Sequence, residues 1–307
     1  MAGSVSWRGE TVSRHILGTA QLGMAYGIAN ECGRPTSTQA TEMLDAAWRQ
    51  GIRCFDTAQA YGESELVLGR SLATMGLSRQ AAVISKFDPA LDPRNTESLR
   101  EAIHRSLQRL RVPCLWAMML HRADWLDAWE TVGAALRSAR TEGGVVYFGA
   151  SVYTATEAWR AISQKEIDII ELPCNAWDSR LLDAGVFEAA RKAGKLCLVR
   201  SIYLQGLLTM SPDAVRERLP LAFPAAERWQ AVCQKSGLGL MEAAVRFALA
   251  LGVPLVIGAE SVAQVAVNAE LLERSPLPAA ILREMAVYMR PAVAEAVLDP
   301  RCWSKRN

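Results

Sequence analysis

The sequence has few histidines and no clustered cysteines. Its 307 residues include 3 His and 7 Cys, and no two cysteines have the C-x-x-C spacing. Metal sites and disulfide frameworks usually show closely spaced or paired ligands, so the sequence predicts neither. No apolar segment of signal-peptide length follows the N-terminal Met1, and we therefore expect a reducing, cytoplasmic location.

Long apolar segments and an excess of one charge are also missing. The most apolar stretch, 247–259, contains Gly252 and Pro254 and is too short to span a bilayer. The formal net charge is +2, from 34 basic and 32 acidic residues, and no segment gathers Lys and Arg into a stripe. We therefore expect neither a membrane nor a nucleic acid as a partner.

Short apolar runs alternate with longer amphipathic stretches along the chain. The runs are mostly apolar throughout, which is typical of strands buried on both faces of a parallel sheet. Eight strands are expected, at 15–19, 52–56, 82–86, 115–120, 145–150, 167–172, 196–200 and 254–257. Helices are expected between them, at 36–50, 95–110, 124–142, 154–163 and 179–193, with glycines after several of them.

Eight β–α alternations predict a single α/β domain, residues 1–307, folded as a closed (β/α)8 TIM barrel. A doubly wound sheet is the competing architecture, but the segment from Gly18 to Gly23 lacks the Gly-x-Gly-x-x-Gly fingerprint. Three additions are expected: a lead at about 3–14, an insertion at 207–237 with a long loop and one extra helix, and a C-terminal helix at about 279–296. Residues 1–10 and 303–307 are expected to be loose.

Polar residues at the carboxyl ends of barrel strands build the active site in this fold. Asp56 and Tyr61 follow the second predicted strand, Lys86 ends the third, and His121 follows the fourth. A lysine ammonium lowers the pKa of a nearby tyrosine, an aspartate keeps the lysine charged, and a histidine positions a carbonyl oxygen. The four residues together predict a proton donor suited to the reduction of a carbonyl group.

The chain resembles the aldo-keto reductases over nearly its whole length, from GTAQLG to IGAESVAQVAVN. The most specific matches are Asp56 and Tyr61 in FDTAQAYGESE, Lys86 in ISKFD and His121 in MLHRAD. The resemblance implies a barrel that binds a nicotinamide dinucleotide in extended form. It also implies that Tyr61 is the general acid, that Lys86 and Asp56 tune it, and that His121 orients the carbonyl.

The resemblance further implies a set of cofactor contacts. The expected residues are Gly18, Thr19, Ala20, Asp56, Ser151, Glu171, Arg200, Ser201, Leu204, Gln205, Gly206, Gly258, Glu260, Gln264 and Asn268. The first loop is expected near the nicotinamide, and the backbone amides of 204–206 near the diphosphate. Asn268 is expected to bond the adenine.

Three of the positions expected near the nicotinamide depart from the family pattern. Val152 stands where an asparagine is usual, Glu171 where a glutamine is usual, and Arg200 where an aromatic residue often stacks on the ring. Glu171 is still able to accept a bond from the carboxamide nitrogen, but it adds a negative charge, which Arg200 is able to neutralise. The alternative for Glu171 and Arg200 is an ordinary ion pair at two strand ends.

The positions expected near the phosphate groups of the cofactor depart further from the family pattern. Gly258 and Gln264, with Glu260 between them, stand where family members that prefer NADP usually carry cations. The loss of two cations and the gain of one anion should weaken the discrimination for NADP over NAD. The habit of the family favours NADP(H), and NAD(H) stays open.

The substrate pocket is expected to be walled by Met24, Tyr26, Trp125, Trp177 and Tyr203. Such a lining suits sugars and aromatic aldehydes alike. The predicted function is the NAD(P)H-dependent interconversion of a small aldehyde or ketone and its alcohol, by a monomer or weak homo-oligomer. Two alternatives are a dinucleotide-binding regulatory barrel and a redox-neutral lyase or isomerase that uses the same acid–base residues.

Overall fold

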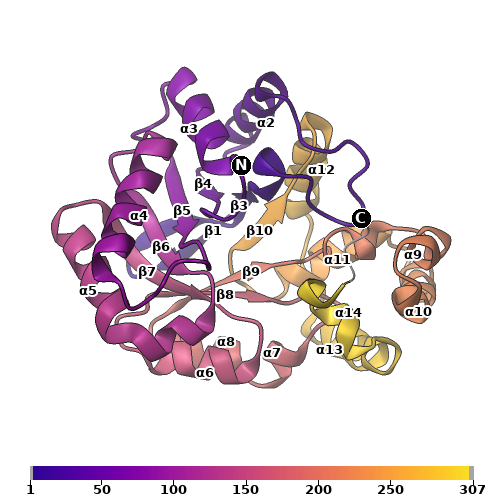
Figure 1. Cartoon of the computed structure of the whole chain (residues 1–307). Coiled ribbons are helices and arrows are strands. Elements are labelled where there is room, and N and C mark those ends of the chain that lie inside the picture. The colour runs from indigo at the N-terminus through magenta and orange to yellow at the C-terminus, as the bar shows by residue number, and fades with distance from the viewer. Residues whose placement is uncertain (1–2, 304–307) are drawn as a thin grey trace.

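The computed structural model describes residues 3–303 and contains a closed barrel of eight parallel strands. The strands are paired in the order β10-β3-β4-β5-β6-β7-β8-β9, with helices around them (Figure 1). Their bounds are β3 (His15–Gly18), β4 (Cys54–Asp56), β5 (Ala82–Lys86), β6 (Leu115–Leu120), β7 (Val145–Ser151), β8 (Ile169–Pro173), β9 (Leu196–Arg200) and β10 (Leu255–Gly258). The predicted (β/α)8 TIM barrel is confirmed.

The helices follow the predicted alternation with the strands. Those around the barrel are α1 (Ala20–Gly23), α2 (Ser37–Arg49), α3 (Ser64–Thr74), α4 (Thr96–Leu110), α5 (Trp129–Thr141), α6 (Ala155–Ser163), α7 (Arg180–Asp183), α8 (Val186–Lys192), α11 (Leu240–Leu249) and α12 (Val262–Leu272). Helix α2 begins with a capping box, because the Thr36 hydroxyl accepts the Gln39 N–H while the Gln39 side chain accepts the Thr36 N–H. The single helix predicted at 179–193 is wrong: Gly185, with a φ of 72°, separates α7 from α8.

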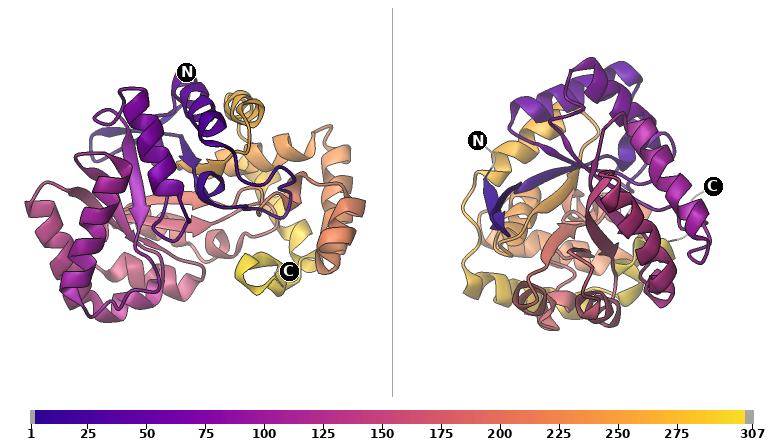
Figure 2. Two further views of the ribbon diagram at one scale, coloured as in Figure 1. Left: turned by 45° about the horizontal axis from the view of Figure 1, so that its top comes forward. Right: turned by 90° about the vertical axis from the view of Figure 1, so that its left-hand side faces the viewer.

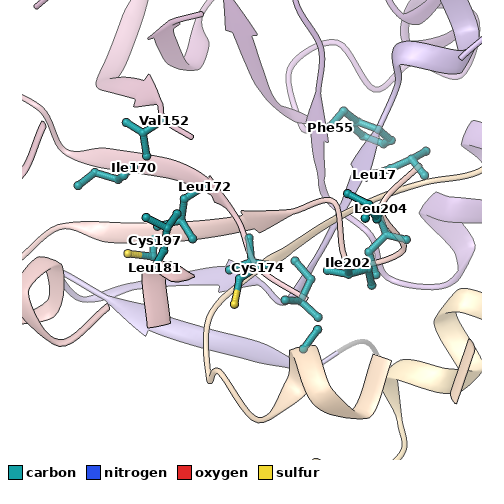
Figure 3. Packing of buried hydrophobic residues seen from close by; sticks show 14 of the residues in the cluster. Leu17, Phe55, Val152, Ile170, Leu172, Cys174, Leu181, Cys197, Ile202 and Leu204 are labelled. Carbon is teal, nitrogen blue, oxygen red and sulfur yellow. The ribbon is translucent and has the colours of Figure 1, made fainter. Parts of the chain in front are cut away.

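Side chains of the barrel strands alternate between the interior of the barrel and the surrounding helices. The interior cluster includes Ile16, Cys54, Ile84, Met119, Ile169, Leu198 and Val256. The outer cluster, part of which is seen in Figure 3, includes Leu17, Phe55, Ile170 and Cys197. Two residues further along the chain from the interior positions, the same alternation reaches Gly18, Asp56, Lys86, His121, Glu171, Arg200 and Gly258. Polar groups from separate strands therefore converge at the carboxyl end of the barrel.

The N-terminal lead is an ordered hairpin, so the expectation that residues 1–10 are loose is wrong for residues 3–10. Strands β1 (Ser4–Trp7) and β2 (Glu10–Ser13) pair antiparallel. Trp7 Nε1 donates a hydrogen bond to the Gly194 carbonyl oxygen at 3.1 Å, and the Trp7 ring packs against Tyr147. Gly194 precedes β9, and the right-hand view of Figure 2 shows the hairpin at the left edge of the molecule. The hairpin thus closes the amino end of the barrel, away from the converging polar groups.

The insertion after β9 contains two helices rather than one, α9 (Pro212–Arg218) and α10 (Phe223–Lys235), which lie at one side of the barrel in Figure 1. The C-terminal helix predicted at 279–296 ends early, as α13 (Ala279–Met289), where Pro291 interrupts the helical hydrogen bonds. A short α14 (Glu295–Leu298) follows.

The C-terminal segment returns to the barrel. The Arg301 guanidinium carbon lies 3.6 Å from the centroid of the Tyr153 ring, in the loop after β7. Residues 304–307 of the tail expected to be loose lie outside the described residues. Between residues 3 and 303, no helix combines the length and apolar character needed to cross a membrane.

Candidate active site

Four charged side chains from four strands form a continuous chain of contacts at the carboxyl end of the barrel. Lys86 Nζ lies 2.6 Å from both carboxylate oxygens of Asp56 and 3.2 Å from Glu171 Oε2. Glu171 Oε1 lies 3.3 Å from Arg200 Nε and accepts a hydrogen bond from Ser151 Oγ at 3.1 Å. We call Asp56, Lys86, Glu171 and Arg200 the charged floor. It balances two acidic side chains against two basic ones, and the expected Glu171–Arg200 pair is one of its links.

The charged floor shifts the pKa values of its own acids. Burial raises the pKa of Asp56 to about 8; the charge of Glu171 adds to the rise, and Lys86 opposes it. Burial also disfavours the charge of Glu171, but Lys86 and Arg200 outweigh it and hold the pKa of Glu171 below its usual range. The first proton that this pair of carboxyl groups takes up therefore goes to Asp56.

Tyr61 and His121 lie beside the charged floor. Their ring centroids are 5.6 Å apart in an edge-to-face arrangement, and Lys86 Nζ lies 5.6 Å from the centroid of the Tyr61 ring. The structure thus brings together Asp56, Tyr61, Lys86 and His121. Burial and the charge of Lys86 lower the pKa of His121 to about 4, so its imidazole is neutral at pH 7.

The pKa of Tyr61 differs from the expectation. Burial of the phenol raises the pKa of Tyr61 above its usual range, and this effect is larger than the lowering by Lys86. Asp56 and Glu171 add to the rise because their negative charges disfavour a phenolate. The expected lowering by Lys86 is present, but the net shift has the opposite sign.

A cleft lies at this end of the barrel and extends to the start of α12. It is lined by Gly18, Thr19, Ala20, Gln21, Tyr26, Gly27, Ala29, Asp56, Tyr61, Glu171, Arg200, Ser201, Ile202, Tyr203, Gln205, Gly206, Thr209, Met241, Val256, Ile257, Gly258, Glu260, Gln264 and Asn268. Of the residues expected to contact a cofactor, all except Ser151 and Leu204 line this cleft. Lys86 is fully buried and touches the cleft residues Asp56 and Glu171.

Ser151 and Leu204 lie just outside the cleft lining. Ser151 is buried and bonds Glu171. The side chain of Leu204 belongs to the outer hydrophobic cluster, as does Val152, and Figure 3 labels both. The contact expected for Leu204 involves its backbone amide and does not depend on where its side chain packs.

Only two of the five residues expected to wall a substrate pocket line the cleft, namely Tyr26 and Tyr203. Trp125 and Trp177 are buried in the outer hydrophobic cluster, and the ring of Trp125 packs on Phe87. Met24 is exposed and does not line the cleft. Trp125 and Trp177, which the sequence suggested for substrate binding, thus pack in the hydrophobic core instead.

Some residues of the segment between β3 and α2 line the cleft and were not predicted. They include Gln21, Gly27 and Ala29. The backbone N–H groups of Ile28 and Ala29 donate to the Gln205 carbonyl oxygen at 3.1 and 3.4 Å, so this loop crosses to the loop after β9. Gly206, with a φ of 99°, makes the crossing possible, because a Cβ there would lie 2.3 Å from Ala29 Cβ. Gln21 was recognisable from the sequence because it lies within the motif GTAQLG. The contact between the loops after β3 and β9 was not recognisable from either loop alone.

The start of α12 is capped by its own side chains. Ser261 Oγ accepts the Gln264 N–H at 3.2 Å, and Gln264 Oε1 accepts the Glu260 N–H at 2.8 Å. Asn268 Oδ1 accepts a hydrogen bond from the Tyr203 hydroxyl at 2.7 Å. Within the described chain, Arg200 is the only Lys or Arg that lines the cleft. The lining near Glu260 therefore contains no Lys or Arg side chain among the described residues.

Comparisons with known proteins place the chain in a family. The sequence model of the Aldo/keto reductase family matches residues 15–286. The chain is 27% identical over 281 residues to a 6-dehydroglucose reductase of Novosphingobium aromaticivorans, which covers 83% of this chain and 88% of that protein. It is 27% identical over 314 residues to a D-threo-aldose 1-dehydrogenase of a Pseudomonas species, which covers 88% and 94%.

Solved structures share the fold. An aldo-keto reductase from Bacillus halodurans superimposes with a TM-score of 0.76 at 22% identity, covering 97% of this chain and 98% of the other. A glycerol dehydrogenase from Gluconobacter oxydans gives a TM-score of 0.74 at 21% identity, covering 95% and 96%. The chain belongs to the aldo/keto reductase family, NAD(P)-dependent oxidoreductases that interconvert carbonyl compounds and alcohols.

Proposed function

We propose that this enzyme interconverts a carbonyl compound and its alcohol at the carboxyl end of the barrel, with Tyr61 as the group that exchanges the proton. The observation that carries the proposal is the convergence of Tyr61, His121, Lys86 and Asp56 beside one cleft. A hydroxyl, a buried ammonium and a neutral imidazole in one place match the needs of proton delivery to a carbonyl oxygen.

Each of the four residues has a distinct role in this proposal. Tyr61 donates its hydroxyl proton to the carbonyl oxygen during reduction and takes it back during oxidation. The Lys86 ammonium stabilises the phenolate that forms as the proton leaves, which offsets part of the rise in pKa caused by burial. Asp56 holds Lys86 in place through two contacts of 2.6 Å. His121 is neutral at pH 7 and orients the carbonyl oxygen by a hydrogen bond.

The cleft residues fit a nicotinamide dinucleotide. Ser201, Leu204, Gln205 and Gly206 all have positive φ values, so they form a tight turn whose backbone is able to approach a diphosphate closely. The start of α12, an 11-residue helix, lies beside this turn and favours an anion. When bound, the cofactor supplies or accepts the hydride at the carbonyl carbon. Glu171 and Ser151 would hold its carboxamide, and Asn268 its adenine.

We further propose that the enzyme discriminates only weakly between NADPH and NADH. Glu260 lines the cleft near the start of α12, and the one basic side chain of the lining, Arg200, is already paired with Glu171. A phosphate on the ribose would gain no strong ion pair there and would meet one negative charge.

A sugar is the substrate class that we favour. Two relatives that align with most of this chain carry the names of sugar oxidoreductases, a 6-dehydroglucose reductase and a D-threo-aldose 1-dehydrogenase. Tyr26 and Tyr203 line the cleft and offer aromatic faces and hydroxyls of the kind that bind sugar rings. We also propose that the enzyme works in the cytoplasm, a reducing compartment that suits its seven free thiols, and that it is a monomer or weak homo-oligomer.

The proposal is tested by a panel of aldoses, ketoses, aromatic aldehydes and the corresponding alcohols, each assayed with NADH and with NADPH. We expect substrate-dependent changes in nicotinamide absorbance, largest with sugars. Binding of the dinucleotide without turnover on any substrate would instead support a regulatory barrel. Conversion of a sugar with no absorbance change in a single turnover would support a redox-neutral lyase or isomerase.

A further inference from the structure

Glu171 is the acid of the charged floor to which the proposed proton transfer assigns no part. It is buried, with 1% of its surface exposed, and it lies in β8, across the barrel from Lys86 on β5. It nevertheless contacts Lys86 Nζ at 3.2 Å and Arg200 Nε at 3.3 Å. A buried carboxylate that touches the lysine expected to stabilise the Tyr61 phenolate must influence the charge of that lysine and of its other partner.

Two carboxylates share one ammonium in this arrangement. Asp56 makes the shorter contacts with Lys86, and the Thr57 carbonyl oxygen accepts a further hydrogen bond from Nζ at 3.2 Å. Two acids beside the same cation repel each other when both are ionised, so one of them takes up a proton more readily than an isolated acid does. Their surroundings decide which one it is.

Glu171 has more partners that stabilise a negative charge than Asp56 has. Glu171 has a second cation, Arg200, and a hydrogen bond from Ser151 Oγ, both on the oxygen that does not face Lys86. Asp56 has Lys86 as its one cationic partner among the described residues. The extra partners stabilise the charge of Glu171, so Asp56 is the acid that becomes neutral.

We propose that Glu171 is a positioning residue that acts through Lys86 and Asp56: as the second counter-ion of Lys86, it shares the ammonium with Asp56 and makes Asp56 the acid of the pair that takes up a proton. The inference rests on the proposed function, because it assigns this proton uptake to the site where Tyr61 acts. It predicts that the pH range of activity is set in part by a residue that touches neither the transferred proton nor Tyr61.

The other ionisable groups that face Asp56 and Glu171 each keep a single protonation state between pH 6 and 8. These groups are Tyr26, Cys54, Tyr61, Lys86, His121 and Arg200. Burial raises the pKa of the two tyrosines and of the Cys54 thiol, and burial lowers the pKa of His121 to about 4. Asp56, with its pKa of about 8, is thus the group of this site that titrates between pH 6 and 8.

The sign of the effect on stability follows from linkage. Folding raises the pKa of Asp56, so the folded protein holds a proton that the unfolded chain has already released. Stability from this group is therefore fully present below the unfolded pKa and is lost as the pH rises toward 8. Over the range in which the folded state holds the proton and the unfolded state does not, the unfolding equilibrium constant rises by about tenfold per pH unit.

The test compares wild type with E171Q, which keeps the size of the side chain and removes its charge. E65Q is the matched control, because Glu65 is also 1% exposed, lies 3.6 Å from Arg109 and accepts a hydrogen bond from Ser85, yet does not line the cleft. The first measurement is the unfolding equilibrium constant between pH 6 and 8, without substrate or cofactor. The second is the pH profile of kcat/KM with an active substrate of the panel.

We expect E171Q to lose most of the rise in the unfolding constant between pH 6 and 8, while E65Q keeps the wild-type slope. The limb of the kcat/KM profile that lies near pH 8 should move to lower pH by about one unit or more in E171Q. A shift of stability that is equal at every pH, with an unchanged profile, would overturn the inference, because a purely structural role has that result.

Two further variants keep the outcome decisive. E171D retains the charge and should restore the wild-type slope. If E171Q does not fold, D56N replaces it in the unfolding measurement, and a wild-type slope in D56N would overturn the inference. A changed slope in E171Q, together with no turnover of the wild type on any substrate, would support the shared counter-ion while refuting the proposed function.

Discussion

Lys86 Nζ lies at the same distance, 2.6 Å, from both carboxylate oxygens of Asp56, and both side chains are buried. The two residues end adjacent parallel strands, β4 and β5, and the register places both on the interior of the barrel. A buried pair of this kind is stable only while both partners are present, since removal of one leaves an uncompensated charge.

Replacement of Lys86 by methionine should therefore affect stability and activity together. K86M leaves Asp56 and Glu171 without their shared cation, and we expect the free energy of unfolding to fall by about 3–5 kcal/mol. Denaturant unfolding at pH 7 measures this loss. The double variant D56N/K86M also removes the acid that has lost its partner, and it should regain part of the stability without regaining turnover. Recovery of turnover in the double variant would contradict the role assigned to Lys86.

The N-terminal hairpin should contribute to stability and not to catalysis. Trp7 is almost fully buried at the amino end of the barrel, with its ring centroid 4.8 Å from that of Tyr147. We expect W7A to lower the free energy of unfolding by about 3 kcal/mol through the cavity that it leaves. At a temperature where W7A is fully folded, its kcat should equal that of wild type. A lower kcat under those conditions would mean that the hairpin influences the opposite end of the barrel.

Much of the barrel is readable from the sequence because its signals are local. Apolar runs mark the eight strands, and the period of two along each strand predicts which residues face the interior. The hairpin was missed because β1 and β2 are only four residues each and are stabilised by distant partners such as Gly194. The break in the C-terminal helix had a local signal, Pro291, and was predictable.

The candidate site was readable where each residue ends its own strand, as Asp56 and Lys86 do. The contact between Lys86 and Glu171 was not readable, because it joins side chains of non-adjacent strands, β5 and β8. Trp177 illustrates the opposite error: an aromatic residue after a strand suggests binding, but its burial depends on packing with residues far along the chain.

The contact between the loops after β3 and β9 should depend on Gly206. In G206A the new Cβ would lie 2.3 Å from Ala29 Cβ, and alanine is also strained at a φ of 99°. We expect weaker cofactor binding and lower stability, measured by fluorescence titration and thermal unfolding. G237A is the matched control, since Gly237 has a φ of 65° but no atom within 4 Å of the added Cβ. Equal cofactor affinity in G206A and G237A would show that the contact does not shape the cleft.

The charge of Glu260 should limit the affinity for NADPH. Replacement of Glu260 by alanine removes an acid from the cleft lining, and we expect the ratio of NADPH to NADH affinity to rise by roughly tenfold, or about 1.4 kcal/mol. Titration of wild type and E260A with each reduced cofactor measures the ratio. E270A, on the helix α12 that follows Glu260 but outside the cleft lining, should leave the ratio unchanged. A strong preference of wild type for NADPH would contradict the electrostatic account.

The central claim is that Tyr61 exchanges the proton with the substrate, and Y61F tests it most directly. Phenylalanine keeps the ring that packs against His121 and removes only the hydroxyl. We predict that Y61F folds with the thermal stability of wild type, binds NAD(P)H with unchanged affinity, and has lost turnover by at least about 100-fold, the usual contribution of a general acid. The measurement is steady-state turnover of an active sugar, with cofactor titration of the same preparation. Wild-type turnover in Y61F would contradict the account.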